Sequence, residues 1–381
     1  MAGRKHILVV LGTRPEAIKL APVVFALRER PDDACVTLCS TGQHRSMLDE
    51  TLAAFELRPD HELGVMRPGQ HPTDLLSRLL AALRPLLAEL RPDTVVVQGD
   101  TTTVMAAALA GYLDHVRVAH VEAGLRTGDK RAPFPEEVNR RVTGVLADDH
   151  FVPTPGAREN LLAEGVPRQR IFLTGNTIVD ALRWMRRRVA DVPPPARLVP
   201  PGRRLVLVTA HRRESFGGPL RDLCLALRDL AGRFDDVQLV YPVHLNPRVR
   251  GPVHEILGDV PRVSLTEPLP YGDFVGLLVR ASLVLTDSGG IQEEAPSLGT
   301  PTLVLREKTE RPEALRTGVV RLVGTSRARI VAEAARILAD GAARPTTPRP
   351  LAVYGDGRAA RRIAEVLIDG RMTTPPFEPE A

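Results

Sequence analysis

The sequence predicts two α/β domains, each built on a parallel β-sheet, that face each other across a central cleft. Three observations support this fold class. The chain has 381 residues, which exceeds the length at which one hydrophobic core usually keeps growing. Short β-branched apolar runs alternate with longer helical patterns, as is typical of parallel sheets crossed by helices. Polar residues gather directly after the predicted strands, where open α/β sheets bind ligands.

Apolar runs of strand length divide into two similar sets. In the first half we predict strands at 6–11, 36–40, 94–98, 116–121 and 150–153, and a last strand with a hinge at 171–177. In the second half we predict strands at 204–209, 238–242, 263–266, 283–286 and 302–305. The boundary is placed near residue 175, before an arginine-rich helix and the proline-rich loop 192–203. We expect 342–350 to be another proline-rich connector and 373–381 to be a frayed tail.

Composition limits the classes of partner. The formal net charge is +5, but the basic residues are spread along the chain among acids, and aromatic residues make up only 4%. A small anionic ligand therefore fits better than nucleic acid, which would need a basic surface and stacking rings. Three scattered cysteines predict neither disulfides nor a metal site and suit a reducing cytosol. No apolar segment has the length of a membrane span, so we expect a cytoplasmic protein that binds no membrane.

The stretch 285–296 has the pattern of an anion-binding turn. An apolar strand runs into Ser288, Gly289 and Gly290 and then opens a helix, whose first N–H groups are free to bind a phosphate. Glu294 follows at a distance suited to a ribose hydroxyl. The stretch is predicted to hold a diphosphate and a ribose. An ordinary turn that needs glycine for its backbone angles remains an alternative on the residues alone.

Acids and a histidine follow other strands. Asp100, Glu122 and Glu136 are candidate proton donors or acceptors, although Asp100 and Glu122 could equally be helix caps. His211, between a strand and two arginines, is a candidate acid, base or phosphate ligand, or else a structural turn residue. Arg14 is a candidate phosphate contact or simply opens a helix at Pro15, while Lys19 could form a surface ion pair with Glu16.

Several common chemistries lack their motifs. The first strand is not followed by G-x-G-x-x-G, and the chain has no G-x-x-x-x-G-K-[ST], H-E-x-x-H or cysteine pair. We therefore expect no nicotinamide, no metal and no other cofactor.

Read in order, the motifs closely resemble the non-hydrolysing UDP-N-acetylglucosamine (UDP-GlcNAc) 2-epimerases over roughly residues 6–370. The matching segments are GTRPEAIKLAP (12–22), TGQHRSMLD (41–49), RPGQ (67–70), QGDTTT (98–103), HVEAGLRTGD (120–129), PFPEEVNRR (133–141), GNTIVDAL (175–182), TAHRRESFG (209–217), YPVHLNP (241–247), DSGGIQEEAPSLG (287–299) and TERPEA (309–314).

The resemblance implies a GT-B-type fold of two Rossmann-like domains and a homodimer. The first domain would comprise 1–174 and, because the last helix near 357–370 crosses back, about 357–372; the second would comprise 175–356. The implied reaction is reversible C2 epimerisation of UDP-GlcNAc to UDP-ManNAc by anti elimination of UDP to 2-acetamidoglucal and re-addition. The implied use of the product is bacterial cell-surface polysaccharide or related amino-sugar biosynthesis.

The resemblance also implies a role for each matching residue. Asp100, Glu122 and Glu136 would carry acid/base work, with His211 beside the diphosphate and the reacting sugar. The substrate and UDP contacts would be Arg14, Lys19, Phe274, Ser288, Gly289, Gly290, Glu294 and Arg311. A second UDP-GlcNAc site that activates the enzyme would involve Gln43, His44, Gln70, Arg212 and His244.

One segment departs from the family pattern, and three alternative functions compete with the non-hydrolysing reaction. Pro268-Leu269-Pro270 stands where many relatives have a glutamine that holds the base, and leucine cannot hydrogen-bond uracil.

A GT-B glycosyltransferase would share the fold, but three acids would occupy its acceptor space. A hydrolysing epimerase would release ManNAc and UDP. A catalytically silent nucleotide-sugar sensor is disfavoured by the intact acids and His211.

Overall fold

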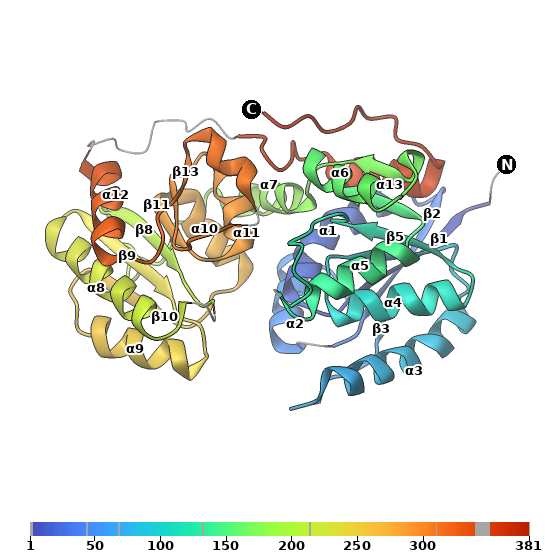
Figure 1. The fold of residues 1–381 in the computed structure, drawn as a ribbon, viewed down its shortest axis with the longest axis horizontal. Helices are drawn as coiled ribbons and strands as arrows, with labels where there is room; N and C mark the ends of the chain where they lie inside the picture. The colour runs from blue at the N-terminus through green and yellow to red at the C-terminus, as the bar shows by residue number, and fades with distance from the viewer. Residues whose placement is uncertain are drawn as a thin grey trace. The chain divides into compact units, whose positions relative to one another are not determined.

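The computed structural model describes residues 3–42, 45–67, 69–131, 133–212, 215–309, 311–339 and 351–380. These residues fall into two compact units. Unit 1 contains 3–183 and 354–379, and unit 2 contains 184–353 and residue 380. Figure 1 labels most of the elements of each unit. Helix α7 (Thr177–Val189) runs across the point where the chain leaves unit 1.

Unit 1 is built on a parallel sheet that has seven strands within the described residues, in the order β3-β2-β1-β4-β5-β6-β7. The strands are β1 (Lys5–Leu11), β2 (Ala34–Ser40), β3 (His61–Glu62), β4 (Thr94–Gln98), β5 (Arg117–Val121), β6 (Asp149–Val152) and β7 (Ile171–Leu173). Residues 7–11 are almost fully buried, because helices cover both faces of a parallel sheet.

Helices α3 (Pro72–Leu90), α4 (Thr102–Leu113) and α5 (Glu136–Leu146) pack one beside the next in unit 1. Helix α1 (Arg14–Arg28) packs against α2 (Arg45–Ala54) and α13 (Ala359–Asp369). Unit 1 also contains helix α6 (Pro155–Ala163). Local signals set the helix starts: Pro15 lies in the first turn of α1, and the Thr101 hydroxyl accepts the Val104 N–H at the start of α4.

Unit 2 is built on a second parallel sheet, with the order β10-β9-β8-β11-β12-β13 among its described strands. These are β8 (Arg204–Thr209), β9 (Val237–Pro242), β10 (Val263–Thr266), β11 (Ala281–Thr286), β12 (Thr302–Val304) and β13 (Val320–Leu322). Helix α8 (Gly218–Arg233) packs against α9 (Pro247–Leu257) and α12 (Arg327–Ala339), whereas α10 (Tyr271–Arg280) packs on β8 and β11. The short α11 (Gly289–Glu294) follows β11.

The structure differs from the sequence predictions at three places. Strands β3 and β13 were not predicted because they have only two and three residues and lie at sheet edges, where no long apolar run is needed. Residues 373–379 are packed rather than frayed. Phe377 is fully buried and donates its N–H to the Leu173 carbonyl at 2.9 Å. Buried Thr374 donates its N–H and its hydroxyl to Glu365, each at 2.7 Å.

No helix within the described residues is both long and apolar enough to cross a membrane.

Candidate active site

Glu122 lies at the carboxyl end of β5 in a left-handed backbone conformation, with φ of 63°. That conformation costs a non-glycine residue about 1–3 kcal/mol and is enriched at functional sites, although Glu56, Arg91, His115 and Arg262 also have it here. The carboxylate oxygen Oε2 accepts a hydrogen bond from Gln98 Nε2 at 3.0 Å and forms an ion pair with Lys19 Nζ. Asn176 Nδ2 approaches the same oxygen at 3.4 Å. The structure therefore brings Lys19 and Glu122 together, as the resemblance implies for one site, and Lys19 is not a surface partner of Glu16.

Asp100 follows the neighbouring strand β4, and Gly99 N–H donates to the Val121 carbonyl at 3.0 Å, which aligns the two strand ends. The Asp100 carboxylate pairs with Arg140 of α5, and the Asp100 carbonyl accepts from Asn139 Nδ2 at 2.9 Å. Asp100 is not the cap of α4, because Thr101 has that role. An arginine partner holds a partly exposed carboxylate in a fixed orientation.

The acids of α5 have different surroundings. Glu136 is the first residue of α5, and its Oε2 atom is buried without a hydrogen-bond partner among the described residues. Such an oxygen is costly unless a ligand or water completes it. Glu137, which sequence reasoning did not single out, is fully buried and accepts the N–H groups of Thr127 and Gly128 at 3.1 and 3.2 Å. Glu137 thus holds the loop before the helix, while Glu136 is available for chemistry.

Glu16 is a second buried acid that the sequence did not single out for this edge. It accepts hydrogen bonds from Gly12 N–H at 2.5 Å, Thr13 N–H at 3.1 Å and the Thr101 hydroxyl at 2.5 Å. Burial raises the pKa of Glu16 to about 7, although these hydrogen bonds act in the opposite direction. Glu16 links the start of α1, where half-buried Arg14 lies, to the turn that carries Asp100.

In unit 2, the stretch after β11 has the predicted strand-to-helix geometry. Ser288 is the N-cap of α11, and Gly289 and Gly290 form its first turn. Neither glycine has a positive φ, so the alternative that glycine serves only the backbone angles is wrong. A β-carbon at Gly290 would meet no protein atom closer than 4.0 Å, the Ser288 hydroxyl. Packing within the protein therefore does not require glycine there, and close approach of a ligand would.

The other predicted nucleotide contacts lie on neighbouring elements of unit 2. Glu294 is buried and accepts a hydrogen bond from the Tyr271 hydroxyl at 2.8 Å. Arg311 Nε donates to buried Glu293 Oε1 at 2.7 Å. Phe274, on α10, is 8% exposed. Each side chain is thus held by a neighbour or by packing, which limits the entropy that ligand binding would cost.

His211 follows β8 and lies beside two groups from other strands. Its ring stacks on His244 with centroids 5.4 Å apart, and its Nδ1 atom is 3.8 Å from Asp287 Oδ1. Burial lowers the pKa of His211, with smaller lowering by His244 and Arg212 and an opposing effect of Asp287. The imidazole is therefore poised to be neutral until an anion approaches it.

The residues implied for a second UDP-GlcNAc site are only partly described. Gln43 and His44 lie outside the described residues. In unit 1, Gln70 Oε1 accepts from the Arg67 N–H at 3.1 Å and from Arg78. In unit 2, His244 Nδ1 accepts the Asn246 N–H at 3.1 Å, and Arg212 donates its N–H to Asp287 at 2.8 Å.

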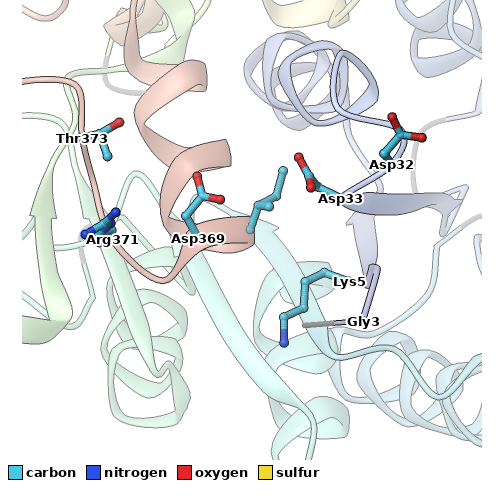
Figure 2. Close-up of a pocket in the computed structure, with 8 residues that line it drawn as sticks. Gly3, Lys5, Asp32, Asp33, Asp369, Arg371 and Thr373 are labelled. Atoms are coloured by element: carbon cyan, nitrogen blue, oxygen red, sulfur yellow. The ribbon is translucent and has the colours of Figure 1, made fainter. Parts of the chain in front are cut away.

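A cavity of about 600 Å³ lies at the opposite edge of the unit 1 sheet, where β1 and β2 begin. In Figure 2, Asp32 and Asp33 lie on one side of it and Asp369 and Arg371 on the other, with Lys5 below. Arg30 already pairs with both Asp33 and Asp369. This cavity holds none of the predicted site residues. In the part of the chain that the structure describes, no cluster of three histidine, cysteine or acidic residues could hold a metal ion.

Comparison with known proteins identifies the family. A family model described as UDP-N-acetylglucosamine 2-epimerase matches residues 26–368. The UDP-N-acetylglucosamine 2-epimerase of Escherichia coli O157:H7 is 51% identical over 374 residues, which cover 96% of this chain and 99% of that protein.

Solved structures agree. The UDP-GlcNAc 2-epimerase from Neisseria meningitidis, bound to UDP-GlcNAc, has a TM-score of 0.89 at 40% identity and covers 96% of this chain and 100% of that one. S. aureus MnaA, in a co-structure with UDP, has a TM-score of 0.85 at 41% identity, with 95% and 96% covered. The predicted GT-B-type pair of Rossmann-like domains is thereby confirmed. With identity and family match both extending over almost the whole chain, this protein belongs to the UDP-N-acetylglucosamine 2-epimerase family.

Proposed function

We propose that this protein interconverts UDP-GlcNAc and UDP-ManNAc by a non-hydrolysing mechanism. Family membership supports the reaction class. The observation that carries the proposal is the environment of Glu122, a carboxylate on a strained backbone held by Lys19 and Gln98 beside the strand end that carries Asp100. Such placement serves proton transfer better than it serves stability, because an ordinary cap needs neither the strain nor the cation.

The C2 proton of the sugar is too weakly acidic for simple exchange, so elimination is the accessible route. A carboxylate base takes the proton, the C–H electron pair forms the C1–C2 double bond, and the C1–O bond breaks to release UDP. UDP then adds back to 2-acetamidoglucal while C2 is protonated on the opposite face. Asp100, Glu122 and Glu136 supply the acid and base groups in this scheme, with Arg14 and Lys19 as further substrate contacts in unit 1.

UDP departs as an anion and must stay bound for re-addition. We assign Ser288, Gly289 and Gly290 to the phosphates, Glu294 to the ribose, and Arg311 and Phe274 to the nucleotide. The free N–H groups at the helix start and the space above Gly290 support this assignment. His211, neutral until an anion approaches, would gain charge as the diphosphate leaves the sugar.

The test is an incubation with UDP-GlcNAc alone, without metal, nicotinamide or acceptor, followed by proton NMR. UDP-ManNAc should accumulate to equilibrium with no free ManNAc. Stoichiometric ManNAc and UDP would instead identify a hydrolysing enzyme, and consumption that requires an added acceptor would identify a transferase. An Asp100→Asn variant should keep its fold and lose the conversion.

We propose that a second UDP-GlcNAc activates the enzyme, through Gln43, His44, Gln70, Arg212 and His244. With UDP-ManNAc as the only starting substrate, the reaction should show a lag that added UDP-GlcNAc removes. Hyperbolic kinetics without stimulation would contradict this proposal.

We further propose that the protein is a homodimer, with α5 at the interface. Val138, Val142 and Val145 lie one helical turn apart on α5 and are exposed, Val145 by 85%. Leu113, at the end of the neighbouring α4, is 62% exposed. A contiguous apolar stripe on a helix is typical of an interface. Val145→Glu should give monomers in analytical ultracentrifugation, whereas Val192→Glu, an exposed valine of unit 2, should not.

A further inference from the structure

Asp287 lies between β11 and Ser288, and its role is not explained by UDP binding. The residue is fully buried. One carboxylate oxygen, Oδ2, accepts the N–H groups of His211 and Arg212, each at 2.8 Å. Asp287 therefore fixes the backbone of the turn after β8 from the neighbouring strand β11.

The second carboxylate oxygen of Asp287 lacks a hydrogen-bond donor among the described residues. Oδ1 is buried and has no hydrogen-bond partner among the described residues, and His211 Nδ1 lies 3.8 Å away. A buried carboxylate oxygen without a donor is costly, so the geometry favours closing this gap. The His211 side chain is 39% exposed, which leaves room for a small rotation of the ring.

Among the residues that the structure describes, few other groups could complete Oδ1. Asp287 also borders a cavity of about 10 Å³ whose lining is mostly aliphatic, from Ala210, Leu220, Leu223, Leu305 and Ile330. Ser215 and Thr325 are the polar side chains that also line it. A space of this size is at the lower limit for one water molecule. Within the described part of this turn, His211 is thus the titratable donor placed to complete the carboxylate.

We propose that Asp287 is a positioning residue for His211. Its carboxylate accepts a hydrogen bond from the Nδ1–H group, so that the unprotonated Nε2 is the nitrogen presented to the ligand. The assignment of that ligand, the sugar diphosphate, rests on the proposed function. The state of the ring does not, because Asp287 and His211 both belong to the free protein. The arrangement is the carboxylate and imidazole pairing by which a buried acid fixes a histidine tautomer.

The charge of His211 should also depend on Asp287. The titratable and charged groups that act on His211 are Asp287, which favours protonation, and His244 and Arg212, which oppose it. His244 is committed through its own Nδ1 to the Asn246 N–H. Among the described groups, removing the negative charge of Asp287 therefore leaves only those that oppose protonation, and imidazolium becomes harder to form beside an anionic ligand.

Asp287→Asn separates the two roles of this residue. The asparagine oxygen can still accept both backbone N–H groups, but its amide would donate to His211 Nδ1 and impose the Nε2–H tautomer. We expect kcat to fall ~10²-fold with KM changed less than ~3-fold, which is the size of a lost acid/base group rather than a lost contact. The pKa of His211 on the kcat profile should also move down. Asp229→Asn, which loses an exposed ion pair with Arg327, is the control and should change neither.

Nitrogen-15 NMR of the ligand-free wild type provides a test that needs no variant to fold. His211→Gln identifies its signal among the ten histidines. A neutral His211 protonated on Nδ1 supports the proposal, and one protonated on Nε2 overturns it. An Asp287→Asn protein with unchanged kcat and pH profile also overturns it. An Nδ1–H tautomer in a protein that does not epimerise UDP-GlcNAc would leave this inference standing and reject the proposed function instead.

Discussion

The carboxyl edges of the two sheets differ in the contacts that their acids make. In unit 1 two of the candidate acid/base residues are held by side chains: Lys19 and Gln98 hold Glu122, and Arg140 holds Asp100. In unit 2 an acid holds the backbone: Asp287 binds two N–H groups, and Gly290 leaves open space beside a helix start. Oriented carboxylates suit proton transfer, and preorganised N–H donors suit an anion that forms and must be retained. This difference supports the proposal that unit 1 carries out proton transfer and unit 2 binds UDP.

Removing an acid from unit 1 should have the largest effect. Glu122→Gln keeps the size and the contact with Lys19 but removes the proton acceptor, so kcat should fall ~10³-fold. UDP affinity, measured by calorimetry, should stay within a few-fold because the nucleotide is assigned to unit 2. The exposed Glu89→Gln on α3 serves as control. Loss of UDP affinity in parallel with kcat would break the comparison.

Glu16 should give unit 1 a pH dependence of stability. Its pKa is raised in the folded state, so the protonated form is favoured by folding. The resulting stabilisation is present below pH 4.5 and is lost as the pH rises through about 7, by up to ~3 kcal/mol. Glu16→Gln should remove this contribution. The free energy of unfolding of the wild type minus that of the variant, measured by urea unfolding, should therefore decrease between pH 5 and pH 8. The exposed Glu29→Gln, just beyond α1, should leave the pH dependence of the wild type unchanged, and equal slopes for all three proteins would refute the role of burial.

A substitution in the phosphate-binding turn proposed for unit 2 should have a smaller and different effect. Gly290→Ala adds a methyl group that meets no protein atom closer than 4.0 Å, so stability should hold while UDP affinity falls ~10-fold through the lost approach to the backbone. The variant should also release more glucal and UDP per turnover. Gly232→Ala on α8, where the added carbon likewise meets nothing, is the matched control. A rise in KM without glucal release would mean that this turn binds UDP but does not retain it.

The sequence predicts the central strands well because a parallel strand buried on both faces must be a continuous apolar run. It cannot predict which acid of a pair faces a ligand. Glu136 and Glu137 are adjacent, and only packing decides that Glu137 binds the loop N–H groups. Lys19 and Glu16 are one helical turn apart, yet Lys19 pairs with Glu122, 103 residues away. Long-range partners of this kind, including those of Asp287, follow from strand order rather than from local pattern.

Deuterium incorporation tests the central claim most directly, namely that the C2 proton is removed while UDP is eliminated and retained. UDP-GlcNAc should be incubated with the protein in D₂O and followed by proton NMR and mass spectrometry. We predict one deuterium at C2 in both UDP-sugars, traces of 2-acetamidoglucal, and no exchange with Glu122→Gln. Conversion to UDP-ManNAc with the original hydrogen still at C2 would contradict the mechanism and the division of roles between the two units.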